Sequence, residues 1–217
     1  MGGGKIRVNR IEDAADRAAV LEVLRATYQA EKGWVPDAES QIADSDVGST
    51  QVSWFLASYS GEPAGVLRVH YAPSLEQYGS YGMRTLRPGI DVTMFLRTSR
   101  PAEIGRFAIV PGLRRNLSIS VALMRAATRE TVERGFTHYI TDVFESDPHS
   151  PYGFHTRVMG FDPVATHDHG ELQCTSRRIT MVLDLKAAYQ RLRCRRGWIF
   201  RALTADWDAR LHQRLAV

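Results

Sequence analysis

The sequence predicts a single α/β domain, residues 1–217, with a mixed central sheet flanked by helices and a helical extension at its C-terminus. Strand-like and helix-like segments alternate through most of the chain, which is the pattern of a layered α/β fold. A hairpin signal in the first half and a strand–helix–strand order in the second require antiparallel and parallel pairing in one sheet. The composition, 44% hydrophobic and 24% charged, is that of a globular protein.

The first half of the chain is predicted to form a strand, a helix and a hairpin. Apolar residues recur at helical spacing after Asp13, a residue type that caps helix N-termini. The turn residues of 60–63 (SGEP) stand between two apolar runs, which is a hairpin signal. The expected elements are a strand at 5–11, a helix from 13 to about 31, a loop at 37–50, strands at 51–58 and 64–71, and a long irregular connection at 73–101.

The second half alternates again and ends in a helical segment. Residues 103–109 are apolar enough for a buried central strand, and Gly135 is placed to close the helix that follows it. The expected elements are a strand at 103–109, a helix at 117–134, a strand at 138–143, a short helix at 151–159, strands at 161–166 and 178–185, and a helical segment at 189–215.

The most informative stretch runs from Glu103 to Met124. Its strand is broken by residues 110–112 (VPG), and a basic turn leads into the helix. A helix N-terminus presents unpaired N–H groups and partial positive charge, so this turn is a candidate cradle for a phosphate or pyrophosphate. The candidate ligands are Arg114, Arg115 and the amides of Asn116, Leu117 and Ser118, with a solvated basic turn as the alternative.

Charge is distributed unevenly along the chain. Residues 186–217 contain eight basic and two acidic residues, a net charge of +6, whereas the whole chain carries +4. A local basic segment of this kind attracts an acidic partner, a nucleic acid or an anionic membrane. The candidate docking residues are Arg193, Arg195, Arg196 and Arg201, although such arginines are often only a solvated helix face.

Several classes of protein are disfavoured. No apolar run approaches the roughly 20 residues of a membrane span, and the N-terminus lacks a signal-peptide core, so no integral membrane association is expected. Cys174 and Cys194 fit free thiols in a reducing cytoplasm. Residues 167–169 (HDH) form a short histidine cluster without a Cys or Glu at ligand spacing, so no metal site is expected.

Two motifs resemble those of the GNAT acyltransferase superfamily. Residues 115–120 (RNLSIS) fit its phosphate-binding turn, Arg/Gln-x-x-Gly-x-Gly/Ala, with serine in both small positions. Residues 156–161 (TRVMGF) partly match its Tyr-x-x-x-Gly-Phe signature, with Thr156 where the superfamily often has a tyrosine general acid. The resemblance implies a GNAT-like mixed sheet flanked by helices.

A closer resemblance is to the acyl-homoserine lactone synthases within that superfamily. Residues 103–108 (EIGRFA) look like their Glu-x-x-Arg-Phe-Ala strand, and Arg68 matches a strand arginine. Their N-terminal Arg, Phe and Trp are resembled by Arg25, Tyr28 and Trp34 at slightly different spacing, and their acidic pair by Asp44 and Asp46. The match is good at the strand 103–108, which belongs to the acyl-binding half of these enzymes, and imperfect in the N-terminal part. The resemblance therefore implies the same acyl donor as in the lactone synthases and a different acceptor.

The whole chain resembles the long-chain N-acyl amino acid synthases of soil bacteria, most closely the N-acyl tyrosine synthases known from environmental DNA. The resemblance implies transfer of a long acyl chain from acyl carrier protein to the α-amine of a small-molecule amino acid, with tyrosine as the expected acceptor. The donor would be an acyl-phosphopantetheine thioester, and no tightly bound cofactor is expected.

This chemistry suggests roles for the central strand. Glu103 is the candidate base, because a carboxylate on a buried strand has its pKa raised by desolvation. Arg106 would orient Glu103 or bind a substrate carboxylate through two hydrogen bonds; the alternative is that Glu103 merely pairs with Arg106. N–H groups around Phe107, Ala108 and Ile109 would stabilise an oxyanion if the strand bulges there.

The substrate pockets are predicted less directly. Arg25, Tyr28 and Trp34 form part of an acceptor pocket or pack over the core, and Arg68 lies near that pocket or makes a structural ion pair. Flexible apolar residues suit an acyl tunnel, and each candidate is otherwise ordinary core. The tunnel candidates are Met83, Met94, Phe95 and Phe144.

Three alternatives remain open at this stage. The first is a GNAT enzyme that uses acetyl-coenzyme A, against which the Met-rich and aromatic connection 73–101 argues mildly. The second is a true homoserine lactone synthase, whose N-terminal spacing fits less well. The third is a non-catalytic basic module that binds a partner through residues 191–214. Interleaving of its arginines with an apolar helical stripe, and the lack of a nucleic-acid fold signature, disfavour nucleic acid as that partner.

Overall fold

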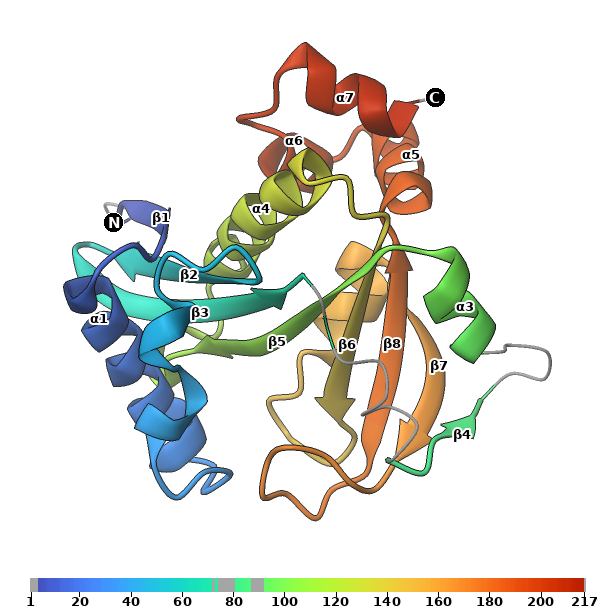
Figure 1. The fold of residues 1–217 in the computed structure, drawn as a ribbon. Helices are drawn as coiled ribbons and strands as arrows, with labels where there is room; N and C mark the ends of the chain where they lie inside the picture. Colours follow the sequence, from blue (N-terminus) through green and yellow to red (C-terminus); the bar gives the residue numbers. More distant parts are fainter. Residues whose placement is uncertain (1–3, 72, 74–80, 87–91, 217) are drawn as a thin grey trace.

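The computed structural model describes residues 4–71, 73, 81–86 and 92–216 as one mixed α/β domain (Figure 1). Eight strands form one sheet in the order β1-β2-β3-β5-β6-β8-β7-β4. The strands are β1 (Ile6–Arg10), β2 (Val52–Tyr59), β3 (Glu62–His70), β4 (Arg84–Thr85), β5 (Pro101–Ile109), β6 (His138–Phe144), β7 (Asp162–His167) and β8 (Arg178–Asp184).

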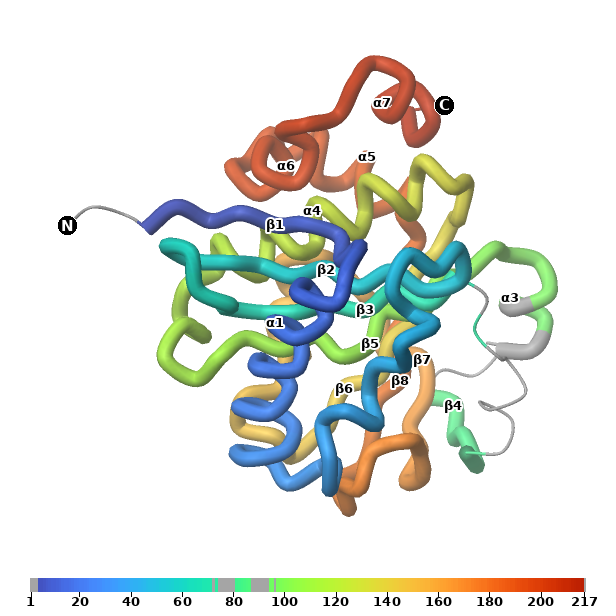
Figure 2. Tube along the Cα trace, turned by 60° about the vertical axis from the view of Figure 1, so that its left-hand side comes forward, coloured from blue at the N-terminus to red at the C-terminus, as the bar shows by residue number. Residues whose placement is uncertain are grey.

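Helices cover both faces of this sheet, as Figures 1 and 2 show. Alternation along the strands decides which helix each side chain meets: Val66 packs toward α1, and its neighbour Leu67 packs toward α4. The α-helices are α1 (Ala14–Leu24), α3 (Val92–Thr98), α4 (Leu117–Glu133), α5 (Leu185–Arg195), α6 (Trp198–Leu203) and α7 (Ala209–Ala216). No helix among the described residues is long and apolar enough to cross a membrane.

Short helical turns complete the framework of the site. They are η1 (Arg25–Gln29) and η5 (Phe154–Met159), both of π type, and the 3-10 turns η2 (Ala38–Gln41), η3 (Asp44–Asp46) and η4 (Pro111–Leu113). The predicted cap Asp13 accepts a hydrogen bond from the Asp16 amide at 2.8 Å. The predicted helix from 13 to 31 therefore begins as expected, but it widens to a π turn at Arg25.

Other expectations need correction. The predicted loop at 37–50 contains two 3-10 turns. Each is closed by a local backbone hydrogen bond, from the Ile42 amide to the Glu39 carbonyl in η2 and from the Val47 amide to the Asp44 carbonyl in η3. The hairpin turn is shorter than predicted, because Ser60 and Gly61 both adopt positive φ and β3 begins at Glu62. The connection 73–101 contains β4 and α3 in its described part; residues 74–80 and 87–91 lie outside the described residues.

The C-terminal segment 189–215 is not one helix but three. α5 ends where Arg196 turns to φ 48°, ahead of Gly197, and a second break falls between Leu203 and Ala209. Asp208 accepts a hydrogen bond from the Leu211 amide at 2.8 Å, so α7 has its own N-terminal cap. The breaks fold the segment back over α4, where Leu203, Leu211 and Leu215 are buried in the main core.

The feature that creates the site is the separation of β5 from β6. Only residues Pro101–Ile104 of β5 pair in parallel with residues His138–Thr141 of β6. Beyond Ile104 and Thr141, Figure 1 shows the two strands diverging. β6 stays paired with β8, while β5 stays paired with β3. The sheet is thus split at its centre, between two strands that each have a partner on the other side.

Gly160 ends η5 with φ 86°, and an added Cβ there would meet the guanidinium of Arg191. Arg191 donates to the carbonyls of Met159 and Gly160, so it is held in place. We expect Gly160→Ala to lower the free energy of unfolding by about 1–2 kcal/mol, because a left-handed conformation is unfavourable for a residue with a Cβ.

Gly112→Ala is the matched control, since an added Cβ there meets nothing within 4 Å. It should change stability by less than about 0.5 kcal/mol, as ordinary surface substitutions do. Chemical denaturation measures both variants. Equal stability of the two would contradict the conformational requirement at Gly160.

Candidate active site

A cleft of about 660 Å³ lies where β5 and β6 separate. It is lined by β5 residues 103–109, β6 residues 141–144, the end of η1, the turn leading into α4, and loop residues 170–172. Its size is that of a small-molecule pocket. The cleft brings together half of the predicted site residues: Glu103, Arg106, Phe107, Ala108, Ile109, Arg114, Arg115, Leu117, Tyr28, Trp34 and Phe144.

β5 bulges on the cleft wall. Its register with β3 shifts, so that Ala108 faces Val66 but Gly105 already faces Arg68, and Arg106 adopts φ 50°. Two residues of β5 therefore stand opposite one residue of β3, which leaves one of them outside the ladder. Gly105 is required for close approach, because a Cβ there would stand 3.0 Å from Nη2 of Arg68.

The bulge directs two arginines to two different carboxylates. Arg68 Nη2 donates to Glu103 Oε1 at 3.0 Å, whereas Arg106 Nη2 donates to Glu171 Oε2 at 2.8 Å. Arg106 Nε also donates to Oε1 of Gln41 at 2.9 Å. Glu103 thus pairs with Arg68 and not with Arg106, and Arg68 makes the ion pair that was one of its two expected roles.

The side chains of Arg68, Glu103 and Arg106 are largely shielded from water, whereas Glu171 is 41% exposed. The Arg106 side chain is only 10% exposed, and burial together with the charge of Arg68 lowers its pKa. Burial acts to raise the pKa of Glu171, but Arg106 and Arg68 outweigh it, and the pKa lies below its usual value. Burial raises the pKa of Tyr28, so its phenol stays protonated beside Arg106.

Aromatic rings form the wall on the α1 side. Tyr28 meets Trp34 edge-on with centroids 5.2 Å apart, and Trp34 lies 4.3 Å from Phe144. Arg178 stands 5.0 Å over the Phe144 ring. Arg25 turns away from this wall and pairs with Glu39 on the surface at 2.8 Å. The structure therefore separates Arg25 from Tyr28 and Trp34.

The predicted phosphate cradle lies at the other end of the cleft, at the start of α4. Asn116 caps that helix by accepting from the Ser118 amide at 3.2 Å, and Arg115 and Leu117 face the cleft. Asn116 and Ser118 are not among the lining residues. Arg114 is held by Glu31, whose pKa that hydrogen bond lowers.

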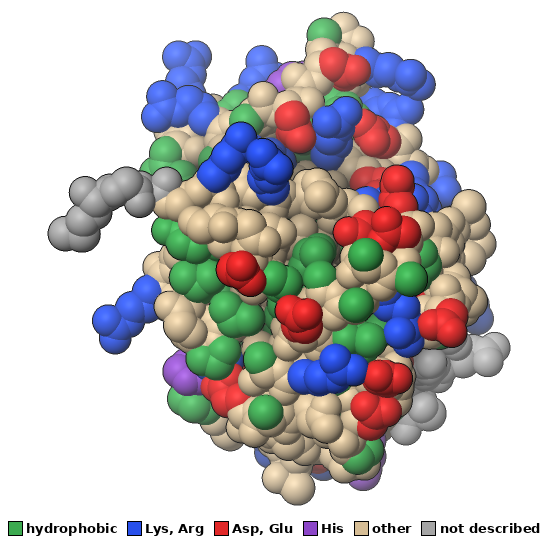
Figure 3. Space-filling view, turned by 90° about the vertical axis from the view of Figure 1, so that its left-hand side faces the viewer, with side chains coloured by type: hydrophobic (Ala, Val, Ile, Leu, Met, Phe, Trp, Pro, Cys, Tyr) green, Lys and Arg blue, Asp and Glu red, His purple; other side chains and the backbone are tan. Residues whose placement is uncertain are grey.

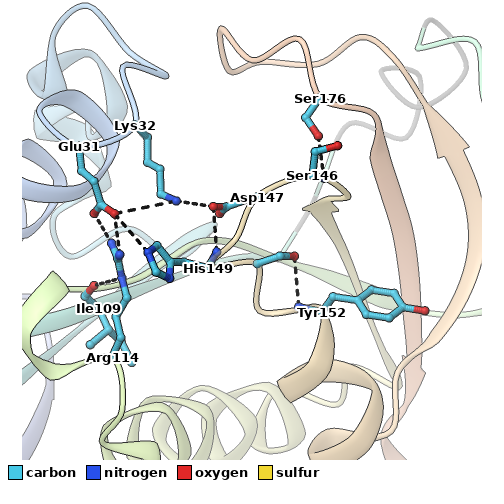
Figure 4. Close-up of polar contacts among 10 residues, drawn as sticks. Glu31, Lys32, Ile109, Arg114, Ser146, Asp147, His149, Tyr152 and Ser176 are labelled. Atoms are coloured by element: carbon cyan, nitrogen blue, oxygen red, sulfur yellow. Dashed lines mark hydrogen bonds and ion pairs between the residues drawn. The ribbon is translucent and has the colours of Figure 1, made fainter.

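Figure 4 shows how Glu31 anchors a larger cluster of charges at this end. Lys32, next to it, pairs with Asp147 in the loop after β6. His149 of the same loop has Nε2 3.9 Å from a Glu31 oxygen. Residues from three separate segments therefore bridge this mouth of the cleft.

The candidate acyl-tunnel residues are divided between three places. Phe144 lines the cleft, and Met83 and Phe95 pack on Ile140 in a small cluster that Tyr81 joins. Met94 is 59% exposed. Tyr81 packs on Ile140 and also lines the cleft, so it links this cluster to the cleft, whereas Met83 and Phe95 are not among the lining residues.

The basic C-terminal arginines lie away from the cleft. Arg214 donates to the Val132 and Glu133 carbonyls at the last turn of α4, whereas the phosphate cradle is at its first turn. A 17-residue helix is about 25 Å long, so Arg214 and the cradle are separated by about that distance along α4, and none of Arg193, Arg195, Arg196 and Arg201 is among the residues that line the cleft. Figure 3 shows Lys and Arg side chains gathered at the end of the molecule formed by α5–α7.

Sequence patterns missed several polar residues of the cleft, among them Tyr81, Asp142, His155 and Glu171. Glu171 arrives on the β7–β8 loop, which docks through a 2.9 Å hydrogen bond from the Gln173 amide to the Trp34 carbonyl. Tyr81 stacks on His167 at 5.3 Å, and His167 Nε2 lies 3.2 Å from Asp142. No local signal marks them, because each is placed by contacts distant in sequence. Within the described ranges, no group of three or more His, Cys, Asp or Glu is placed to hold a metal ion.

Comparison with solved structures identifies the fold. FeeM, an N-acyl amino acid synthase from uncultured soil microbes, has a TM-score of 0.64 at 14% identity, covering 86% of this chain and 94% of that chain. A Desulfovibrio desulfuricans protein described as a GNAT-family acetyltransferase has a TM-score of 0.56 at 12% identity, covering 83% and 99%. The Escherichia coli ribosomal-protein-S18-alanine N-acetyltransferase has a TM-score of 0.56 at 12% identity, covering 83% and 94%.

The family follows from the sequence itself. No curated protein sequence matches the chain at a significant level. A family model for the N-acyl amino acid synthase FeeM, however, matches residues 19–175, which is well over half of the chain and includes both walls of the cleft. The chain therefore belongs to the FeeM family of N-acyl amino acid synthases and is an acyltransferase with a GNAT-like fold.

Proposed function

We propose that this acyltransferase moves a long-chain acyl group from the phosphopantetheine thioester of acyl carrier protein to the α-amine of an amino acid, with tyrosine as the expected acceptor. The observation that carries the proposal is the cleft itself. One end has a basic helix start suited to a phosphate, and the other has paired arginines and carboxylates beside aromatic rings. The bulged strand β5 connects the two ends.

The charge network suits an amino acid. An α-amino acid carries one carboxylate and one ammonium group, and the network offers guanidinium groups for the first and carboxylates for the second. Arg106 is the better carboxylate ligand, because it lines the cleft and its present partner, Glu171, is on a loop. The aromatic wall of Tyr28, Trp34 and Phe144 would receive the ring of tyrosine.

Glu103 is the proposed base. It lines the cleft on the last stretch of β5 that pairs with β6, directly before the bulge. The acceptor amine must lose a proton to attack, and Glu103 would receive it directly or through a water. Arg68 holds this carboxylate, so its orientation is fixed before substrate binds.

The donor is proposed to lie along β5 with its phosphate at the start of α4. Arg115 and Leu117 line that end, and Arg114 would reach the phosphate by exchanging Glu31 for it. Amides of the Phe107–Ile109 stretch would stabilise the oxyanion, since a bulge removes one residue from the ladder. The nearby cluster of Met83, Phe95 and Ile140 offers apolar surface for a long chain.

Product analysis tests the proposal as a whole. Mass spectrometry of lipid extracts from cells that express the chain should detect long-chain N-acyl tyrosine, absent from cells with the empty vector. Detection of other long-chain N-acyl amino acids would support the proposed reaction but contradict tyrosine as the acceptor. Products that carry only an acetyl group would contradict both the long chain and the carrier protein.

Glu103→Gln should lower turnover by about 10²-fold or more, because the variant keeps the shape of the side chain but accepts no proton. Steady-state kinetics with acyl carrier protein and tyrosine measure this effect. Glu133→Gln, on the exposed face of α4 in an ion pair with Arg129, is the control and should retain full turnover. Near-full activity of Glu103→Gln would remove Glu103 from the mechanism.

Carrier docking is tested by charge reversal. Arg195→Glu with Arg196→Glu should raise the apparent KM for acyl carrier protein and spare turnover on small acyl thioesters, because an acidic carrier is attracted electrostatically. The effect should shrink as salt is added. Lys5→Glu, just before β1, with Arg7→Glu on β1 makes the same change in net charge at another exposed site. An equal effect of both pairs, or equal losses on both kinds of donor, would rule out a docking role for α5.

A further inference from the structure

One buried side chain of the cleft has no part in the chemistry proposed above. His155, in η5, is 1% exposed and lines the cleft. Its Nδ1 is buried without a hydrogen-bond partner in the described part of the chain. Buried polar atoms in native proteins are almost always paired, so such an atom calls for an explanation, and an absent substrate is one.

The local backbone is built to place this ring in the cleft. η5 is a π-type turn, a rare conformation that is frequent at functional sites. The His155 carbonyl accepts from the amides of both Gly160 and Phe161, at 2.7 and 2.9 Å, which closes the wide turn. The hydroxyl of the next residue, Thr156, is committed to the Tyr152 carbonyl at 2.8 Å. His155 and not Thr156 is the polar side chain of η5 that meets the cleft.

The surroundings of His155 are aromatic and uncharged. Its ring lies 4.7 Å from Phe161 and 5.7 Å from both Phe107 and Phe154, measured between centroids. Burial alone lowers the pKa of His155 to about 3. The imidazole is therefore neutral at any pH at which an amine acceptor reacts, and a neutral imidazole has one N–H to donate. It acts as a hydrogen-bond donor and not as an acid.

The position of the His155 ring indicates which atom of the thioester it would contact. Phe107 belongs to the β5 bulge, whose amides are proposed to face the carbonyl oxygen of the thioester. His155 approaches Phe107 from η5, which follows β6 and so belongs to the other wall of the cleft. In acyl transfer from a thioester, two atoms gain negative charge: the carbonyl oxygen and the sulfur.

We propose that His155 donates a hydrogen bond to the sulfur of the acyl thioester as that sulfur leaves. The inference rests on the thioester donor of the proposed function. The acceptor nitrogen forms the C–N bond, the C–S bond breaks with its electron pair on sulfur, and the amine proton passes to Glu103. His155 transfers no proton; it stabilises the thiolate, which takes a proton from solvent after release.

The test uses thioesters with one acyl chain and leaving thiols of graded acidity, from alkyl thiols to acidic aryl thiols. His155→Phe removes the donor and keeps an aromatic ring. It should lower kcat/KM by about 10²-fold with alkyl thiols, as loss of a transition-state donor does, and by much less with acidic aryl thiols. The dependence of rate on thiol acidity should therefore be steeper in the variant. Thr156→Val is the matched control and should leave that dependence unchanged.

The outcomes separate this inference from the proposed function. The same loss with every thiol would mean that His155 only packs, and no loss would mean that it is not used; both overturn the inference while transfer itself persists. Absence of amine acylation by the unaltered chain would instead refute the proposed function. Nitrogen NMR on the unaltered chain covers the case in which His155→Phe fails to fold. Binding of an S-(2-oxoalkyl) pantetheine should shift the nitrogen resonances of the His155 ring while the ring stays neutral. Unchanged resonances would contradict a hydrogen bond from His155 to the sulfur.

Discussion

The structure depends on the early separation of β5 from β6. A parallel pair that continued to the ends of both strands would close the sheet and leave no interior space, yet only four residue pairs form. Each strand keeps its other neighbour, β3 for β5 and β8 for β6, so the split opens the sheet without leaving either strand alone. Backbone groups on the facing edges must otherwise find partners, and a bound substrate is the natural source of them.

The bulge at Arg106 determines what the split contains. A regular strand would alternate side chains between the two faces, but the bulge changes the phase of β5 in the middle of the cleft. Arg106 consequently reaches across to Gln41 and Glu171, and Gly105 leaves room for Arg68 to reach Glu103. The two arginines and Glu103, all at low exposure, are then paired, and the more exposed Glu171 completes the network, which satisfies the requirement that buried charges be paired.

Sequence patterns anticipated the elements but not the split. The hydrophobic alternation of β5 and the cap at Asp13 are local signals: β5 forms as predicted, and α1 begins at the predicted cap. The pairing partner of Arg106 is not local: Gln41 and Glu171 are each 65 residues away. The three-part C-terminal segment was readable in principle, because Gly197 follows a run of arginines and Asp208 is a cap residue, but the apolar spacing across both breaks suggested one helix.

The surroundings of Arg106 and those of His155 differ in electrostatic character, and this difference fits the proposed chemistry of amide formation. An amino acid acceptor begins as a charged ammonium carboxylate and needs charged partners, which under our proposal would be Arg68, Glu103, Arg106 and Glu171. A thioester begins neutral and gains charge only as it reacts. A permanent charge beside its sulfur would bind the departing thiolate and slow its release, whereas a neutral donor such as His155 among phenylalanines stabilises it only moderately. Charged partners beside the proposed acceptor site and an uncharged donor beside the proposed thioester site would therefore match the different charges of the two substrates.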